Sequence, residues 1–128
     1  MSLMPRDVYT SERIAPPVGP FSPAVRAGEL LYLSGQVAQE PSTGELVAGG
    51  VDAQAAQIFR NVAAVLEAAG RGFDDVVRVG VYLRDMADFK AMNAVYERQF
   101  ARPYPARTVI GVASLPLGAA IEIDVVAR

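Results

Sequence analysis

Apolar residues between positions 51 and 69 recur every three to four residues, a spacing that places them on one face of an α-helix. The polar residues of the same stretch fall on the opposite face, so this helix should cover one face of a sheet. Asp52 can cap its start and Gly70 its end. The buried face would comprise Ala55, Ile58, Phe59, Val62, Val65, Leu66 and Ala69.

A second amphipathic helix is predicted from about Asp85 or Asp88 to Phe100. The two aspartates are most simply explained as charges at its start. Lys90 lies on the polar side and is expected to be a solvated charge. Asn93 lies close to the buried edge, where a hydrogen bond to a loop is the simplest explanation. The apolar stripe would consist of Phe89, Met92, Val95, Tyr96 and Phe100.

Five further stretches are rich in β-branched and aromatic residues, which predicts strands. The first two form a hairpin around residues 27–29. Residues 76–83 are almost continuously apolar, so this strand should be central and buried on both faces. The last two are joined by turn residues at 115–118. The predicted strands are residues 24–26, 30–37, 76–83, 104–112 and 120–126.

Counting one further strand before the first helix, the expected order of elements is β, β, β, α, β, α, β, β, which predicts an α+β fold with a mixed sheet and both helices on one face. We expect a single domain over residues 1–128, because a chain of this length buries roughly two-thirds of its unfolded surface. Residues 1–4 are set aside, since Met4 could be the native start. The bare sheet face and the apolar fraction of 52% favour closed association of a few copies.

The residue types that the chain lacks restrict its chemistry. The absence of Cys excludes disulfides, thiolate nucleophiles and Cys-based metal sites. The absence of His excludes the Ser-His-Asp triad and His-ligated metals. Lys90 is the only lysine, so a Schiff-base mechanism would depend on it alone. Any catalysis must therefore use carboxylates, arginine, hydroxyls, backbone groups and water.

The charges of the chain give no sign of a polyanionic partner. Its formal net charge is -2, and eleven of its twelve basic residues are arginines that are scattered along the sequence. We therefore expect no nucleic-acid partner. No apolar run reaches the length of a membrane span, and the N-terminus lacks the apolar core of a signal peptide. We expect a cytoplasmic protein without a membrane partner.

Prolines at five positions between residues 5 and 23 prevent a helix and predict an extended arm over the domain. Within this arm, Phe21 either plugs into the core, which is the usual role of a loop aromatic, or forms a wall of a ligand pocket.

Ser34-Gly35-Gln36 interrupts an apolar strand in which Leu31 and Leu33 point one way, and Gly35 follows the same alternation. A β-bulge explains this interruption, and so does the close approach of a ligand or another backbone.

The last two predicted strands each carry a charge where a buried strand would normally be aliphatic, Arg107 in the first and Glu122 in the second. If these strands are near neighbours, the two charges come to a common place. They then form either a structural ion pair or a site that grips an anion and moves a proton. Glu122 and Asp124 share one face of their strand, so a raised pKa is possible on one of them.

Taken together in this order, the motifs of the chain resemble those of the Rid family, the reactive-intermediate deaminases also called YjgF-like proteins. The resemblance covers nearly the whole chain. It is carried by Gly19-Pro20-Phe21-Ser22, Leu33-Ser34-Gly35-Gln36, Asn61, Asp88-Phe89, Asn93, Pro105-Ala106-Arg107 and Ile121-Glu122-Ile123.

The resemblance implies a chorismate-mutase-like fold assembled as a homotrimer, with sheets packed inward around a barrel and a pocket at each subunit interface. It also implies hydrolysis of enamines or imines, such as 2-aminoacrylate, to 2-keto acids and ammonia, with neither a cofactor nor a metal. By resemblance, Arg107 holds the substrate carboxylate and Glu122 is associated with the catalytic water. Phe21 stands where many active members carry Tyr, and Val109 where many carry Cys. The implied substrate-binding residues are Phe21, Ser34, Gly35, Asn93 and Val109.

Two other functions remain open at this point. The Arg107 pocket could bind a 2-keto acid without turning over a substrate, with Phe21 marking the loss of hydrolysis. A ribonuclease or inhibitor of translation, as attributed to members of the family, is disfavoured by the lack of histidine and of a basic patch.

Overall fold

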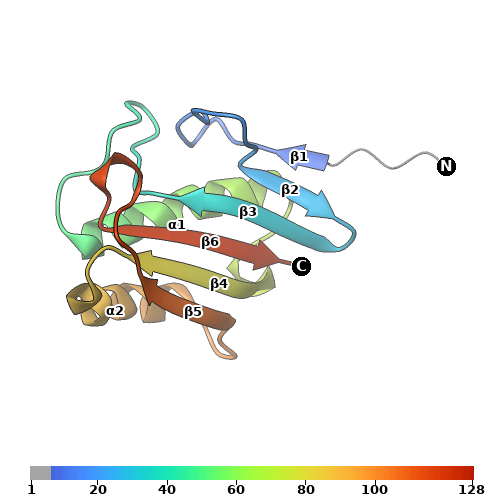
Figure 1. Cartoon of the computed structure of the whole chain (residues 1–128). Helices are drawn as coiled ribbons and strands as arrows, with labels where there is room; N and C mark the ends of the chain where they lie inside the picture. Colours follow the sequence, from blue (N-terminus) through green and yellow to red (C-terminus); the bar gives the residue numbers. More distant parts are fainter. Residues whose placement is uncertain (1–6) are drawn as a thin grey trace.

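The computed structural model describes residues 7–128, which form a six-stranded sheet in the order β1-β2-β3-β6-β4-β5 (Figure 1). The expectation about residues 1–4 lies outside the described residues. The elements follow the predicted order, and the α+β class with its mixed sheet is confirmed. Their bounds are β1 Asp7–Tyr9, β2 Ala24–Ala27, β3 Leu30–Gln36, α1 Val51–Ala68, β4 Val76–Leu83, α2 Phe89–Gln99, β5 Ala106–Gly111 and β6 Ile121–Ala127.

Helix α1 begins and ends close to the predicted positions, but its start is built differently. Gly50 occupies the N-cap position and supplies no side chain, so the predicted cap by Asp52 is wrong. Asp52 lies in the first turn, where its charge is favourable beside the positive end of the helix dipole. At the other end, Gly70 has a φ of +71° and donates its N–H to the carbonyl of Glu67. This left-handed conformation favours glycine, so the predicted end is confirmed.

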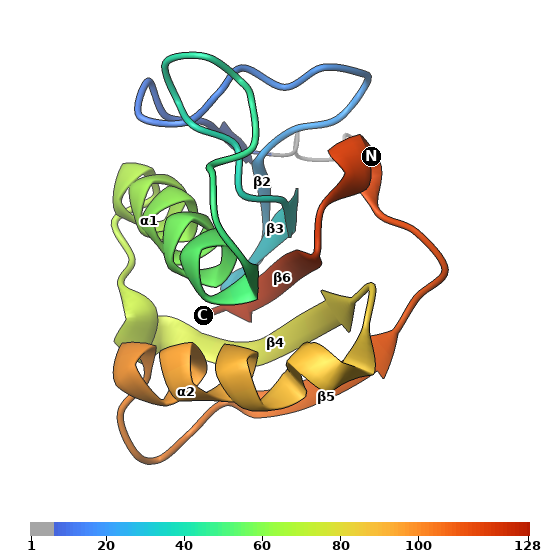
Figure 2. The same cartoon turned by 90° about the vertical axis from the view of Figure 1, so that its left-hand side faces the viewer.

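Helices α1 and α2 lie on the same face of the sheet, as predicted (Figure 2). Phe59 of α1 packs edge-on against Tyr96 and Phe100, with ring centroids 6.3 and 5.7 Å apart. The predicted stripe of α2 is buried except for Phe89, and Lys90 is exposed as expected. Each large apolar side chain buried here contributes roughly 1.5–3 kcal/mol, so this layer holds both helices against the sheet.

Strand β4 lies between β6, its antiparallel neighbour, and β5, its parallel neighbour. Val79, Val81 and Leu83 are fully buried under the helices. Val77 and Arg78 are exposed, so the prediction that this strand is buried on both faces is wrong for the single chain. The near-continuous apolar run reflects a strand in the middle of the sheet, only one face of which the chain's own helices cover.

The sheet face opposite the helices is open, as predicted from the one-sided placement of the helices. It carries apolar side chains that the chain itself leaves accessible, among them Tyr32, 48% exposed, and Ile110, 45% exposed. Exposed aromatic and β-branched side chains on one face are typical of an association surface. Within residues 7–128, neither helix is both long and apolar enough to cross a bilayer.

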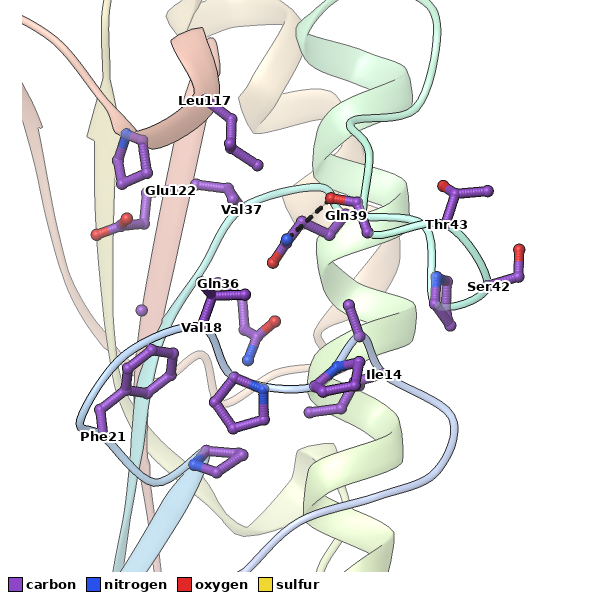
Figure 3. Close-up of a pocket in the computed structure, with 18 residues that line it drawn as sticks. Ile14, Val18, Phe21, Gln36, Val37, Gln39, Ser42, Thr43, Leu117 and Glu122 are labelled. Atoms are coloured by element: carbon purple, nitrogen blue, oxygen red, sulfur yellow. Dashed lines mark hydrogen bonds between the residues drawn. The ribbon is translucent and has the colours of Figure 1, made fainter.

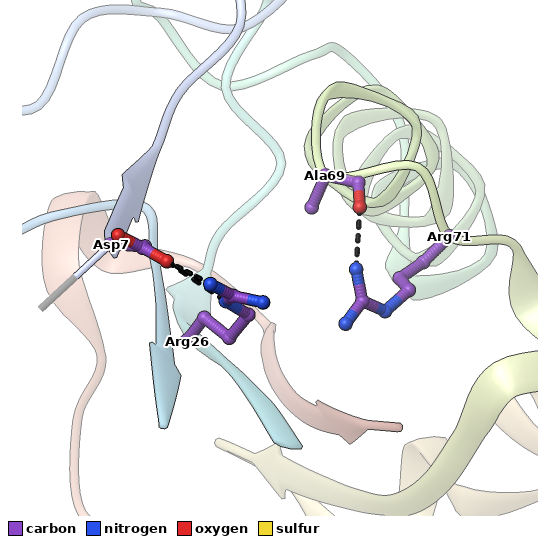
Figure 4. A network of polar contacts seen from close by, with 4 residues as sticks. All are labelled: Asp7, Arg26, Ala69 and Arg71. Atoms are coloured by element: carbon purple, nitrogen blue, oxygen red, sulfur yellow. Dashed lines mark hydrogen bonds and ion pairs between the residues drawn. The ribbon is translucent and has the colours of Figure 1, made fainter. Parts of the chain in front are cut away.

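Strand β1 lies within the proline-rich arm, which the sequence predicted only as extended. An ion pair between Asp7 and Arg26 holds β1 beside β2 (Figure 4). The same view shows Arg71 donating from Nη1 to the carbonyl of Ala69, 2.6 Å away, just after α1. Because Arg71 also donates to the carbonyl of Arg128, it ties the end of α1 to the end of β6.

Candidate functional site

A cavity of about 740 Å³ opens at the end of the sheet where the proline-rich arm meets the loop after β3 and the turn before β6 (Figure 3). Most of its walls are apolar. Among the described residues that line it, Glu122 alone carries an ionisable side chain. The cavity therefore combines one acid with space for an uncharged group. Its apolar walls include Ile14, Pro17, Val18, Phe21, Val37 and Leu117.

Glu122 lies across the backbone of Gly35 on the neighbouring strand β3. A Cβ placed on Gly35 would lie 2.7 Å from Oε2 and 2.9 Å from Cδ of Glu122, so any other residue here would displace this carboxylate. The register between β3 and β6 shifts between Leu33 and Gln36, which confirms the β-bulge. The bulge turns Gly35 to the open face, so the expected alternation with Leu33 is wrong, while the expected close approach is made by the Glu122 side chain.

Burial raises the pKa of Glu122, and the negative charge of Asp124 raises it further. The predicted raised pKa on this strand therefore falls on Glu122. Asp124 lies over Gly80, where a Cβ would come within 2.3 Å of Oδ1. The hydroxyl of Tyr82 donates to Oδ2 of Asp124 over 2.8 Å. Two glycines thus make room for two carboxylates, and burial together with the charge of Asp124 favours the protonated form of Glu122 more than in an isolated glutamate.

Arg107 lies near the start of β5, where α2 forms a cradle for its guanidinium. The Nη1 group donates to Oδ1 of Asn93 over 2.7 Å. The guanidinium carbon lies 4.6 Å from the ring centre of Tyr96 and 5.7 Å from that of Phe89. The face of the Tyr96 ring attracts the cation through its quadrupole, and burial raises the pKa of the Tyr96 hydroxyl. These contacts fix the plane of a cation that lines a second cavity of about 240 Å³.

The structure does not bring Arg107 and Glu122 together within one chain. Strand β4 separates β5 from β6, so the expectation that the two charged strands are near neighbours is wrong. Arg107 pairs with Val79, which is buried under the helices, whereas Glu122 pairs with Tyr82, which faces the opposite side. The two charges therefore lie on opposite faces of the sheet, and within residues 7–128 they form no ion pair with each other.

The remaining predicted residues divide between the cavity, the arm and the core. Phe21 is 49% exposed and lines the larger cavity. Of the two roles predicted for it, packing into the core is therefore wrong, and forming a wall of the cavity is what the structure shows. The hydroxyl of Ser34 donates to the carbonyl of Ser22 over 2.6 Å and so fastens the arm to β3. Val109 packs against the core. Gly35 lies against the side chain of Glu122. Asn93 accepts a hydrogen bond from Arg107 and donates one to Glu97, so the predicted hydrogen bond from Asn93 to a loop is wrong.

The sequence reasoning missed Phe89 and Tyr96 as partners of Arg107, because it assigned both to the buried stripe. The signal that could have found them is their spacing around Asn93: positions four and three residues apart lie on one helix face. Leu117 was assigned only to a turn, although it forms part of the cavity wall.

The arrangement can hold an anion on Arg107 and move a proton at Glu122, two functions that one chain keeps apart. In the part of the chain that the structure describes, no group of three or more acidic, His or Cys side chains is placed to hold a metal ion.

Comparisons with known proteins give consistent results. The profile of the family described as endoribonuclease L-PSP matches residues 11–128. The 2-iminobutanoate/2-iminopropanoate deaminase of Homo sapiens is 41% identical over 127 residues, covering 99% of this chain and 93% of that protein. A RutC family protein of Pyrococcus horikoshii is 43% identical, covering 95% of this chain and 97% of its own. The crystal structure of RidA from the Antarctic bacterium Psychrobacter superposes with a TM-score of 0.92 at 40% identity, covering 96% of this chain and 99% of that one.

Proposed function

Since the chain belongs to the endoribonuclease L-PSP family, which includes RidA, we propose that it hydrolyses enamines and imines of 2-keto acids to the keto acid and ammonia. Relatives at about 40% identity bear the name 2-iminobutanoate/2-iminopropanoate deaminase, which supports this choice over a ribonuclease. The composition supports it too, because such substrates hydrolyse without help and demand little of a chain lacking His and Cys.

The observation that carries the proposal is the position of Glu122. It is a half-buried carboxylate with a raised pKa, it lies over a glycine that makes room for it, and it borders a cavity with apolar walls. A carboxyl group whose pKa is shifted toward neutrality can both give and take a proton, which typically accelerates a reaction 10²–10⁴-fold. Imine hydrolysis needs both transfers.

Arg107 supplies the second part of the site as the clamp for the substrate carboxylate. A guanidinium can donate to both carboxylate oxygens in one plane, and that plane is set here by Asn93 and Tyr96. A carboxylate held in this way fixes the adjacent imine carbon. The orientation of the reacting atoms, rather than a strong nucleophile, is then the main contribution of the protein.

The site is complete only where two copies meet. Arg107 and Glu122 lie on opposite faces of one sheet, and the open face exposes the apolar side chains of Tyr32 and Ile110. A copy packed against this face could bring its β5 edge over the Glu122 cavity of its neighbour. Such a contact joins different surfaces of the two copies, so it must close into a ring. We assign the ring three copies, as expected from the family.

The reaction balances without a cofactor. For an enamine, proton transfer to carbon first gives the imine. Water then adds to the imine carbon, forming the new C–O bond, while a proton passes to nitrogen. The C–N bond breaks, ammonia leaves, and the carbonyl of the 2-keto acid forms. Glu122 orients the water and carries the protons. Phe21 has no hydroxyl to share this task, so the water depends on Glu122.

The test is to generate 2-aminoacrylate or an imine of a hydrophobic amino acid in situ and to follow keto-acid release. Wild type should exceed the spontaneous rate, and Arg107→Ala should lose most of the gain, while Lys90→Ala, a change at an exposed cation, should not. Saturable binding of a 2-keto acid without any acceleration would contradict the enzyme and favour a non-catalytic binding protein.

A further inference from the structure

The turn before β6 presents a leucine in an unusual conformation. Leu117 has a φ of +60° and a ψ of 15°, in the left-handed region that a side chain with a Cβ rarely adopts. Its side chain is also 62% exposed, although leucine is usually buried. The core of the chain therefore does not explain either the residue type or the conformation.

The backbone around Leu117 is held in place from several sides. Arg84 donates from Nη1 to the carbonyl of Gly118 over 2.6 Å. The N–H of Gly118 donates to Leu115, and the N–H of Ala119 donates to Pro116. Pro116, with its restricted φ, begins the short helical turn. The backbone that carries Leu117, and with it the direction of its Cα–Cβ bond, is thus fixed, as a preorganised contact requires.

That direction is into the larger cavity, where Leu117 and Glu122 line the same space (Figure 3). Val18, 87% exposed, and Phe21 add apolar surface to it. No basic residue occurs among the described residues that line the cavity, so a substrate with an acidic side chain would find no partner there. The volume of about 740 Å³ far exceeds what a methyl group would fill.

We propose that Leu117 is a specificity-determining residue that contacts the substrate side chain and selects 2-imino acids with a branched apolar group over those with a methyl group. This inference rests on the proposed function, because it assigns the carboxylate and imine of the substrate to Arg107 and Glu122. Leu117 would recognise a third part of the substrate, its side chain. The strained backbone is kept because it aims an apolar side chain at the substrate.

The test compares imines generated in situ from leucine and from alanine by an L-amino-acid oxidase. Leu117→Asn keeps a residue that tolerates the left-handed region, and Leu117→Gly removes the side chain without strain. Both should lower kcat/KM for the leucine-derived imine about tenfold and change that for the alanine-derived imine less than about twofold. Met86→Gln, at an apolar residue of another short turn that is 47% exposed, is the matched control and should change neither.

A binding measurement separates this inference from the proposed function. Titration calorimetry with 4-methyl-2-oxopentanoate and with pyruvate reports side-chain selection without any turnover. Tighter binding of the branched acid by wild type, lost in both Leu117 variants, would support the inference even if no imine is hydrolysed. Equal affinity of wild type for the two acids, or a preference that both variants keep, would overturn it while leaving the hydrolysis intact.

Discussion

Replacing Gly35 by alanine should disable the proposed catalytic acid while leaving the fold intact. The new Cβ would lie 2.7 Å from Oε2 and 2.9 Å from Cδ of Glu122, well inside van der Waals contact. To regain an ordinary separation the carboxylate must move by about 0.7 Å. The obstructing atoms belong to the end of a flexible side chain, so the move costs little stability. Alanine is also better than glycine within a strand, by roughly 0.5–1 kcal/mol.

A displacement of this size is large for a group that transfers protons. A misplacement near 1 Å can cost about 10²-fold in rate, so Gly35→Ala should lower kcat by roughly 10- to 100-fold. The KM should change less, because Arg107 is untouched. The assay is the initial rate of keto-acid release from imines generated in situ, measured together with the melting temperature.

The matched control is Gly72→Ala. Gly72 has a φ of -135°, and a Cβ on it would meet nothing within 4 Å, so neither the rate nor the fold should change. A Gly35→Ala protein that melts like wild type and turns over at the wild-type rate would refute the claim that this glycine makes room for the catalytic carboxylate.

Three further changes test other parts of the site. Arg107→Lys keeps the charge but loses the planar, bidentate guanidinium. Since a hydrogen bond to a charged group contributes about 1.5–3 kcal/mol, the KM should rise about 10- to 100-fold. Circular dichroism checks that the variant is folded. Glu122→Gln should abolish turnover yet raise the melting temperature at neutral pH. Because the pKa of Glu122 is raised by folding, its ionised form lowers the stability of the folded protein, progressively as the pH rises from the ordinary pKa through the folded pKa. The melting temperatures of wild type and Glu122→Gln should therefore be equal in acid and diverge as the pH rises. An equal difference at every pH would contradict this. Asp124→Asn removes a charge that raises the pKa of Glu122, so the limb of the pH–rate profile governed by Glu122 should move to lower pH, and an unmoved limb would show that Asp124 does not act on it.

The order of elements could be predicted from the sequence because local patterns determine it. The 3.6-residue period of α1 and the β-branched runs of the strands each predict one buried face, and the structure buries these faces; it also buries Gln54, Gln57 and Asn61, which the period had assigned to the polar face of α1. The start of α1 could not be predicted as well, because Asp52 and Gly50 are both acceptable neighbours of a helix end and only the backbone decides between them. The predicted order included a strand at the position of β1, but its residues were not identified, because its pairing with β2 depends on a partner elsewhere in the chain.

The sequence predicted which residues to consider for the site but not how the structure arranges them. Arg107 and Glu122 stand out locally as charges within apolar strands, whereas their placement on opposite faces depends on β4 lying between them. A position in one strand sets the face of a side chain only once the register with its neighbours is known. The sequence suggested the bulge at Gly35, but the same limit hid that the bulge turns Gly35 toward Glu122. Contacts between α2 and β5, such as Tyr96 against Arg107, join residues that local periodicity treats separately.

The central claim is that one copy supplies Arg107 and its neighbour supplies Glu122, and mixed assemblies of two inactive variants test it most directly. Arg107→Ala and Glu122→Gln proteins, unfolded together in equal amounts and refolded, would form rings of mixed composition. If each site draws one residue from each of two copies, random mixing should restore about a quarter of the wild-type activity. Activity no higher than that of either variant alone, in rings shown by native mass spectrometry to be mixed, would contradict the claim.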